Sequence, residues 1–188
     1  MKKIVIIVDV QNDFVNGALG TFEAQMMIPN LLDEMNRRAD KDTCFIFTRD
    51  THDIHYMSSL EGKNLPVPHC IKDTDGWEIY PDVLKEFDRI ADKTFMINGY
   101  VPVINKPTFG STELQHFLTT FVEEEDDIAE ITLMGLCTGI CVMSNALLCK
   151  ATLPEVPVNV VADCCACVTP ETHETALNAM KLCQINII

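Results

Sequence analysis

The chain has few basic side chains: 14 lysines and arginines stand against 28 aspartates and glutamates, which gives a formal net charge of −14. So little positive charge cannot neutralise a phosphate backbone, which excludes nucleic-acid binding. Long apolar runs are also missing. The run from Ile4 to Val8 ends at Asp9 and is too short for a signal peptide or a membrane span. We therefore expect a cytoplasmic protein without a membrane partner.

The sequence also lacks the two C-x-x-C motifs that pair in structural zinc sites, although it contains nine cysteines. Cys164, Cys165 and Cys167 are accordingly interpreted as structural residues. Disulfides are typical of secreted chains, so reduced thiols are expected here. Glycine and proline are modest in number, at 8 and 9. The 188 residues suit a single globular domain over residues 1–188 with a hydrophobic core.

Short apolar strands alternate with helices along the chain. Strands are predicted at residues 4–8, 43–48, 94–98, 101–105, 128–133, 156–162 and 185–188. Helices are predicted at residues 28–38 with Pro29 in the first turn, at 82–87, from about 111 to 121, at 142–150 and from Pro170 onward. A long loop follows Arg49 and ends near Gly76. This alternation predicts a three-layer α/β fold, with helices on both faces of a parallel sheet.

Four polar or reactive residues follow predicted strands, namely Asp9, Asp50, Lys106 and Cys141. Ligands of open parallel sheets bind at the carboxyl ends of the strands, so these residues are expected at one edge. Each has a plainer role when taken alone, such as a turn residue, a solvated strand end or a small buried thiol. Together they favour a thiol nucleophile at Cys141, a base at Asp9 and a charge partner at Lys106.

The stretch from Gly135 to Val142 joins a strand to a helix. With Thr138 as the N-cap, Cys141 falls in the first helical turn, where free N–H groups and the helix dipole favour a thiolate. Backbone N–H groups around Cys137 and Cys141 can hold an oxyanion. Phe14 follows Asp9 closely and is a candidate pocket wall, although core packing is its plainer role.

A second group of side chains suits a metal. In an extended segment, Asp50 and His52 point to the same side and can share one divalent ion, with His69 as a third ligand. Two histidines and one carboxylate suit Zn²⁺, Fe²⁺ or Mn²⁺. The other histidines are less informative: His55 is either a fourth ligand or a loop residue, and surface or packing roles are expected for His116 and His173.

Three segments resemble the isochorismatase-like cysteine hydrolases: Asp9-Val10-Gln11-Asn12-Asp13-Phe14, Lys106-Pro107-Thr108-Phe109-Gly110-Ser111 and Gly135-Leu136-Cys137-Thr138-Gly139-Ile140-Cys141-Val142. Within this superfamily, Arg49-Asp50-Thr51-His52 and Pro68-His69-Cys70 are most similar to the nicotinamidases. The resemblance covers nearly the whole chain. It implies a Rossmann-like, six-stranded parallel sheet and the catalytic triad Asp9, Lys106 and Cys141. It also implies a cis Leu136–Cys137 peptide, an oxyanion hole from the N–H groups of Cys137 and Cys141, and the metal ligands Asp50, His52 and His69.

The function implied by this resemblance is metal-assisted hydrolysis of nicotinamide to nicotinate and ammonia through a thioester. Zn²⁺ is the first expectation for the metal, and a homo-oligomer is expected because the family often forms dimers or larger assemblies. Two alternatives stay open: another amide or ureido hydrolase of the superfamily, and a non-catalytic binding module. The chain departs from the family at Gly139, where an aspartate is usual, and at Leu65-Pro66-Val67, where an aromatic residue often walls the pocket.

Overall fold

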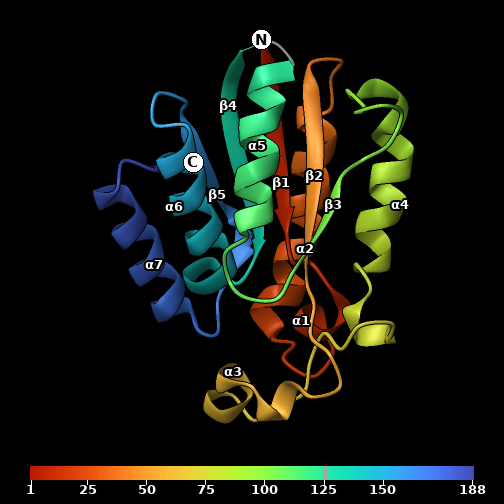
Figure 1. Cartoon of the computed structure of the whole chain (residues 1–188), viewed down its shortest axis with the longest axis vertical. Coiled ribbons are helices and arrows are strands. Elements are labelled where there is room, and N and C mark those ends of the chain that lie inside the picture. The colour runs from red at the N-terminus through yellow and green to blue at the C-terminus, as the bar shows by residue number, and fades with distance from the viewer. Residues whose placement is uncertain (125–126) are drawn as a thin grey trace.

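The computed structural model describes residues 1–124 and 127–188. Its centre is a parallel sheet with the strand order β3-β2-β1-β4-β5-β6 (Figure 1). The strands are β1 (Lys2–Val8), β2 (Thr43–Asp50), β3 (Val103–Lys106), β4 (Ile128–Leu136), β5 (Val158–Ala166) and β6 (Asn186–Ile187). The predicted six-stranded α/β fold is confirmed.

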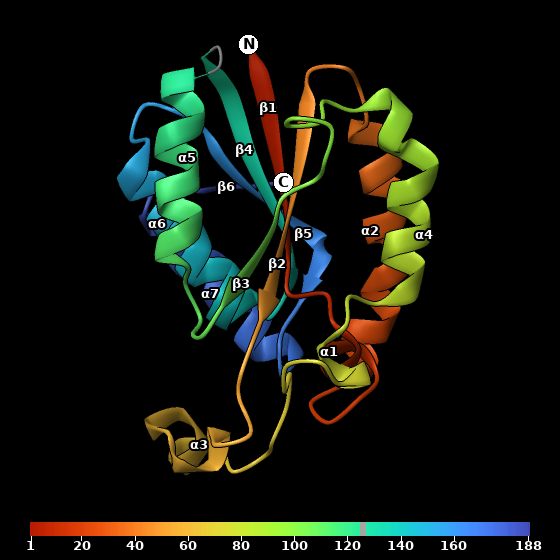
Figure 2. The same cartoon turned by 45° about the vertical axis from the view of Figure 1, so that its right-hand side comes forward.

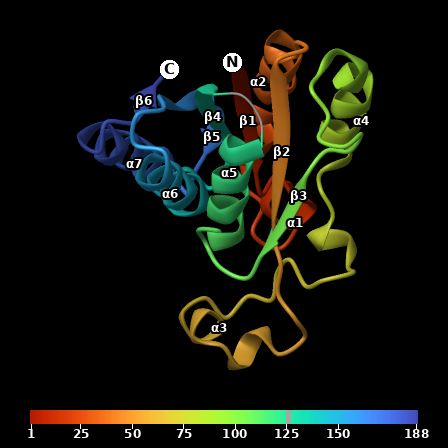
Figure 3. The same ribbon diagram turned by 45° about the horizontal axis from the view of Figure 1, so that its top comes forward.

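Helices cover both faces of the sheet. One face carries α2 (Phe22–Arg38) and α4 (Pro81–Ile90), and the other carries α5 (Thr112–Glu124), α6 (Met143–Thr152) and α7 (Pro170–Leu182) (Figure 2). Two short helices, α1 (Asn12–Val15) and α3 (Leu60–Asn64), lie beyond the carboxyl ends of the strands, and α3 stands apart from the sheet (Figure 3). Within the described residues, no helix combines the length and the apolar character needed to cross a membrane.

The sheet is rigid because its central strands are apolar on both faces. Residues 4–8 of β1 are all β-branched and at most 1% exposed, as expected of a central parallel strand. Phe45 and Phe47 of β2 pack edge-on against Phe87 of α4, with ring centroids 5.8 and 5.4 Å apart. Burying one such side chain contributes roughly 1.5–3 kcal/mol. The strand ends therefore form a firm base for the loops that follow them.

The helix predicted to begin at residue 28 begins at Phe22 instead, and Pro29 lies inside it. The hydroxyl of Thr21 accepts a hydrogen bond from the N–H of Ala24 at 3.0 Å and so caps the helix. Proline cannot donate its backbone hydrogen bond. Burial of the apolar face on either side of Pro29, including Met27 and Leu31, offsets that loss.

Three further predictions differ from the structure. The strand expected at residues 94–98 is absent, because positive φ angles at Asn98 and Gly99 turn the chain into an isolated bridge between Ile97 and Tyr100. The predicted loop after Arg49 carries the 3-10 turns η1 (Tyr56–Ser58) and η2 (Asp75–Trp77) as well as α3. A π-helical turn, η4 (Thr138–Val142), precedes α6, and its N-cap is Cys137 rather than Thr138. The hydroxyl of Thr138 is bonded to His173 instead.

Gly135 lies where β4 passes closest to β1. Its φ is +131°, and a Cβ there would lie 2.1 Å from the carbonyl oxygen of Val8. Gly99 is a matched control, since its φ is +83° and a Cβ there would meet nothing within 4 Å. Gly135→Ala should lower the free energy of unfolding by about 2 kcal/mol or more beyond Gly99→Ala, because it adds a steric clash to a strained backbone. Urea unfolding measures both, and equal losses would contradict the crowding at Gly135.

Candidate active site

A buried ion pair joins the ends of β1 and β3. Lys106 Nζ lies 2.6 Å from Asp9 Oδ2, and both side chains are fully buried. The same Nζ lies 3.5 Å from Cys141 Sγ and 3.5 Å from Asp50 Oδ1. The structure thus brings together the four residues expected at one sheet edge. Lys106 is only 1% exposed, so it is not a solvated strand end.

Neighbouring groups hold this ion pair in place. Asp9 adopts a φ of +49° as the chain leaves β1, a conformation that aspartate tolerates better than most residues. The hydroxyl of Thr48 donates a 2.6 Å hydrogen bond to Asp9 Oδ1. Lys106 Nζ also donates to the carbonyl of Thr108 at 3.0 Å. Asp9 and Lys106 are therefore oriented by bonds from β2 and from the loop after β3.

Burial controls the protonation of these groups. It raises the pKa of the Cys141 thiol well above its usual value, and the nearby Asp9 carboxylate raises it further, against an opposing effect of Lys106. Burial also raises the pKa of Asp9, although Lys106 opposes this. Burial alone would lower the pKa of Lys106, but Asp9, Cys141 and Asp50 outweigh it. Burial thus favours the thiol over the thiolate expected from the helix dipole, and Asp9 is a stronger base than an exposed aspartate.

The turn after β4 carries Cys141 at its far end, and Asn145 holds that end in place. The Leu136–Cys137 peptide is cis, as expected. Asn145 Nδ2 donates to the carbonyl of Cys141 at 2.8 Å, and Asn145 Oδ1 accepts from the N–H of Ser111 at 3.0 Å. Asn145 is fully buried. Its two hydrogen bonds tie the turn to the loop after β3. Sequence reasoning missed this residue, whose only signal was an amide four positions after Cys141 in an apolar helix.

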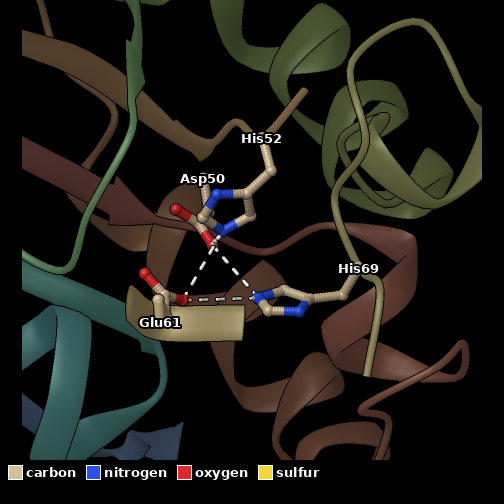
Figure 4. A group of neighbouring side chains, drawn as sticks. All are labelled: Asp50, His52, Glu61 and His69. Atoms are coloured by element: carbon tan, nitrogen blue, oxygen red, sulfur yellow. Dashed lines mark hydrogen bonds and ion pairs between the residues drawn. The ribbon is translucent and has the colours of Figure 1, made fainter. Parts of the chain in front are cut away.

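Asp50, His52 and His69 meet as predicted, and Glu61 of α3 joins them (Figure 4). One ligand atom from each residue lies within 4.8 Å of the others. Asp50 Oδ2 is 3.0 Å from His52 Nε2 and 3.5 Å from His69 Nε2. Glu61 Oε1 is 3.6 and 3.9 Å from the same two nitrogens. His55 is exposed and lies outside this group, so Glu61 is the fourth member instead.

The donor atoms of this group fit a divalent metal. His69 Nδ1 donates to the carbonyl of Val67 at 2.8 Å, which leaves Nε2, directed at Asp50 and Glu61, as the ring nitrogen available to a metal. Asp50 Oδ1 faces Lys106 Nζ at 3.5 Å, so Oδ2 is the oxygen directed at the two histidines. Two imidazole nitrogens with two carboxylates suit Zn²⁺, Fe²⁺ or Mn²⁺. These four residues would hold the ion.

Gln11 and Asp13 hold the backbone of the ligand-bearing segments. Gln11 is fully buried. Its Nε2 donates to the carbonyl of Asp50 at 2.9 Å, and its Oε1 accepts from the N–H of Asp50 at 2.7 Å. Asp13 Oδ2 accepts from the N–H of Cys70 at 2.8 Å, directly after His69. The segment that supplies Asp9 therefore also positions two of the candidate metal ligands.

A cavity of about 280 Å³ is lined by Cys141 and by three of the four candidate metal ligands, Asp50, Glu61 and His69. Phe14 lines it as predicted, with its ring centroid 5.5 Å from that of His69. The rest of the wall is largely apolar and includes Leu19, Leu65, Phe109, Ile140 and Val168. In the described part of the chain, no lysine or arginine lines this cavity. The space suits a small neutral molecule with one polar end.

Comparisons with known proteins agree with this geometry. The family model described as the isochorismatase domain matches residues 3–188. The chain is 24% identical over 190 residues to the nicotinamidase/pyrazinamidase of Mycobacterium tuberculosis, covering 99% of this chain and 98% of that protein. The structure is similar to the pyrazinamidase of Pyrococcus horikoshii in complex with zinc and to the nicotinamidase of Bacillus subtilis. For each, the TM-score is 0.77, the identity is 25%, and the match covers 100% of this chain and 99% of the other.

Glu61→Gln tests whether α3 contributes to metal binding. The substitution keeps the size of the side chain but removes the charge, so the affinity for Zn²⁺ should fall by about 10-fold or more. His55→Ala, in the same loop, is the control and should leave the affinity unchanged. Competition with a chromogenic chelator measures both affinities. Equal affinities of Glu61→Gln and wild type would show that Glu61 is not a ligand.

Proposed function

Because the chain belongs to the isochorismatase family and is most like its nicotinamidases, we propose that it hydrolyses nicotinamide to nicotinate and ammonia. The family and the relatives show a hydrolase that acts on amide bonds. The observation that supports nicotinamide hydrolysis in particular is the contact of Lys106 with Asp9, Cys141 and Asp50. This contact joins a thiol site to a candidate metal group. The proposal includes a single domain over residues 1–188, a cytoplasmic location and a homo-oligomeric state.

In this mechanism Asp9 accepts the proton of the Cys141 thiol, and the thiolate attacks the carboxamide carbon. The backbone N–H groups of Cys137 and Cys141 stabilise the tetrahedral oxyanion. Asp9 then gives the proton to the leaving nitrogen, so that ammonia departs and a thioester remains. Water attacks the thioester with Asp9 as the base, which releases nicotinate and restores the thiol.

Lys106 and the metal ligands have supporting roles. Lys106 Nζ, 2.6 Å from Asp9 Oδ2, keeps the acid oriented and balances its charge through both half-reactions. A divalent metal, most simply Zn²⁺, supplies a Lewis-acidic position for the ring nitrogen when it is held by Asp50, His52, His69 and Glu61. Phe14 packs against the ring, since it lines the cavity beside His69.

The cavity wall argues against anionic substrates. Lys106, the nearest ammonium, is already paired with Asp9, and the described residues that line the cavity include no other basic group. An anion there would have no basic side chain as its partner, which is costly. A neutral carboxamide avoids that penalty. Because Leu65 stands where the family often has an aromatic residue, the second candidate is a different small neutral carboxamide.

Ammonia release from nicotinamide, with and without a chelator, tests the proposed activity. We expect release by the metal-loaded protein, loss after chelation and recovery when Zn²⁺ is added back. A panel of other neutral carboxamides run in parallel identifies the second candidate. Full activity after exhaustive metal removal would contradict a nicotinamidase mechanism. It would remain consistent with a cysteine hydrolase that needs no metal.

Cys141→Ala tests the nucleophile, with Cys137→Ala as a matched control four residues away in the same turn. Removing the attacking sulfur should lower kcat by about 10⁴-fold or more. Cys137→Ala keeps the backbone N–H and should stay within about threefold of wild type, since the proposal gives its thiol no role. Steady-state kinetics give the rates, and circular dichroism checks the fold. Comparable losses in both variants would argue against Cys141 as the sole nucleophile.

A further inference from the structure

A hydrogen bond from α7 reaches the turn that carries Cys137 and Cys141. Thr138 Oγ1 lies 2.8 Å from His173 Nδ1, and Thr138 is fully buried. His173 was expected to have only a surface or packing role. We propose that His173 is a positioning residue for hydrolysis, which acts by holding Thr138 and thereby the oxyanion-binding turn. This inference rests on the proposed function.

Two side chains from outside the turn anchor it, one at each end. At its far end, the side chain of Asn145 holds the carbonyl of Cys141. At its near end, Thr138 directly follows Cys137, whose N–H is one of the two proposed oxyanion donors. Asn145 makes no hydrogen bond to Thr138. Backbone N–H groups of Ile140 and Val142 hold the carbonyl of Cys137, and His173 adds the contact that holds the side chain of Thr138. We infer that the orientation of the Cys137 N–H depends in part on this contact.

Within the turn, only Thr138 has a side chain that can form a hydrogen bond with α7. Among residues 138–142, Thr138 alone has a side chain with an oxygen or nitrogen atom. Gly139 lets α7 approach, because a Cβ at this position would already lie 3.2 Å from Cβ of Ala176 and 3.5 Å from Sγ of Cys167. The departure from the family pattern at Gly139 thus coincides with close packing of the turn on α7.

His173 is itself held firmly. Thr169 caps α7 through a capping box with Thr172, and Pro170 occupies the first turn. The N–H of His173 donates to the carbonyl of Thr169 at 3.0 Å. A helix start defined in this way presents the imidazole from a fixed position. This rigidity is what a positioning residue requires.

The kinetic consequence is specific. Oxyanion donors interact with the substrate mainly in the transition state, so loosening them lowers kcat more than it raises KM. Removing a donor outright costs about 100- to 1,000-fold. A displaced donor should cost less, and we expect a 10- to 100-fold fall in kcat, on the order of the effect of a small misplacement.

Two pairs of variants test the proposal on whichever carboxamide the wild-type protein hydrolyses fastest. His173→Ala and Thr138→Val each remove the hydrogen bond. His173→Asn and Thr138→Ser each retain a polar group near the lost atom and should recover most of kcat. His116→Ala, on the exposed side of α5, is the histidine control and should match wild type. Thermal unfolding of every variant separates positioning from loss of fold.

The double variant of His173→Ala and Thr138→Val gives the decisive comparison. If the two residues act through one bond, the double variant should be no slower than either single variant. The affinity for pyridine-3-carbaldehyde, which forms a tetrahedral adduct with a thiol, should fall in parallel with kcat, whereas the affinity for nicotinate should not. A kcat of His173→Ala within twofold of wild type, or multiplicative losses in the double variant, would overturn the proposal. A wild-type protein inactive on every carboxamide would instead overturn the proposed function and this inference together.

Discussion

The geometry of the site depends on the buried contact between Asp9 and Lys106. A charge buried without its partner costs several kcal/mol, so this pair must close for the chain to fold. The two residues lie at the ends of strands that are not neighbours, because β2 lies between β1 and β3. The register of both pairings, with Val8 opposite Thr48 and Asp50 opposite Lys106, is what brings the charges into contact. A slip of one residue would turn these side chains to the opposite face.

The same arrangement places Asp50 between two chemical functions. One of its carboxylate oxygens faces Lys106, and the other faces His52 and His69. Its pKa is held well below the usual range: burial would raise it, but hydrogen bonds from His52 and His69 and the charge of Lys106 outweigh that effect. Asp50 therefore stays ionised. A change of charge at Lys106 alters the electrostatic environment of the two histidines through Asp50, and the reverse also holds.

Much of the fold and part of the site could be predicted from the sequence. Short, mainly apolar runs identified the central strands, and the rule that parallel strands end at one edge brought Asp9, Asp50, Lys106 and Cys141 together. The features that the sequence did not reveal depend on tertiary packing. Glu61 lies on a five-residue helix with no periodic pattern, and His173 acquires its partner only when α7 packs on η4. Burial, which no local pattern reports, raises the pKa of Cys141 and so opposes the thiolate expected from the helix dipole.

Residues 9, 11 and 13 of the segment after β1 make three separate attachments: to Lys106, to the backbone of Asp50 and to the backbone of Cys70. The spacing between these residues is therefore as constrained as their identities. Point substitutions in this segment disturb one attachment at a time, whereas the gain or loss of a single residue would shift at least one of the three out of register. During divergence, insertions and deletions are accordingly expected in surface loops elsewhere, whereas residues 9–13 should keep a constant length.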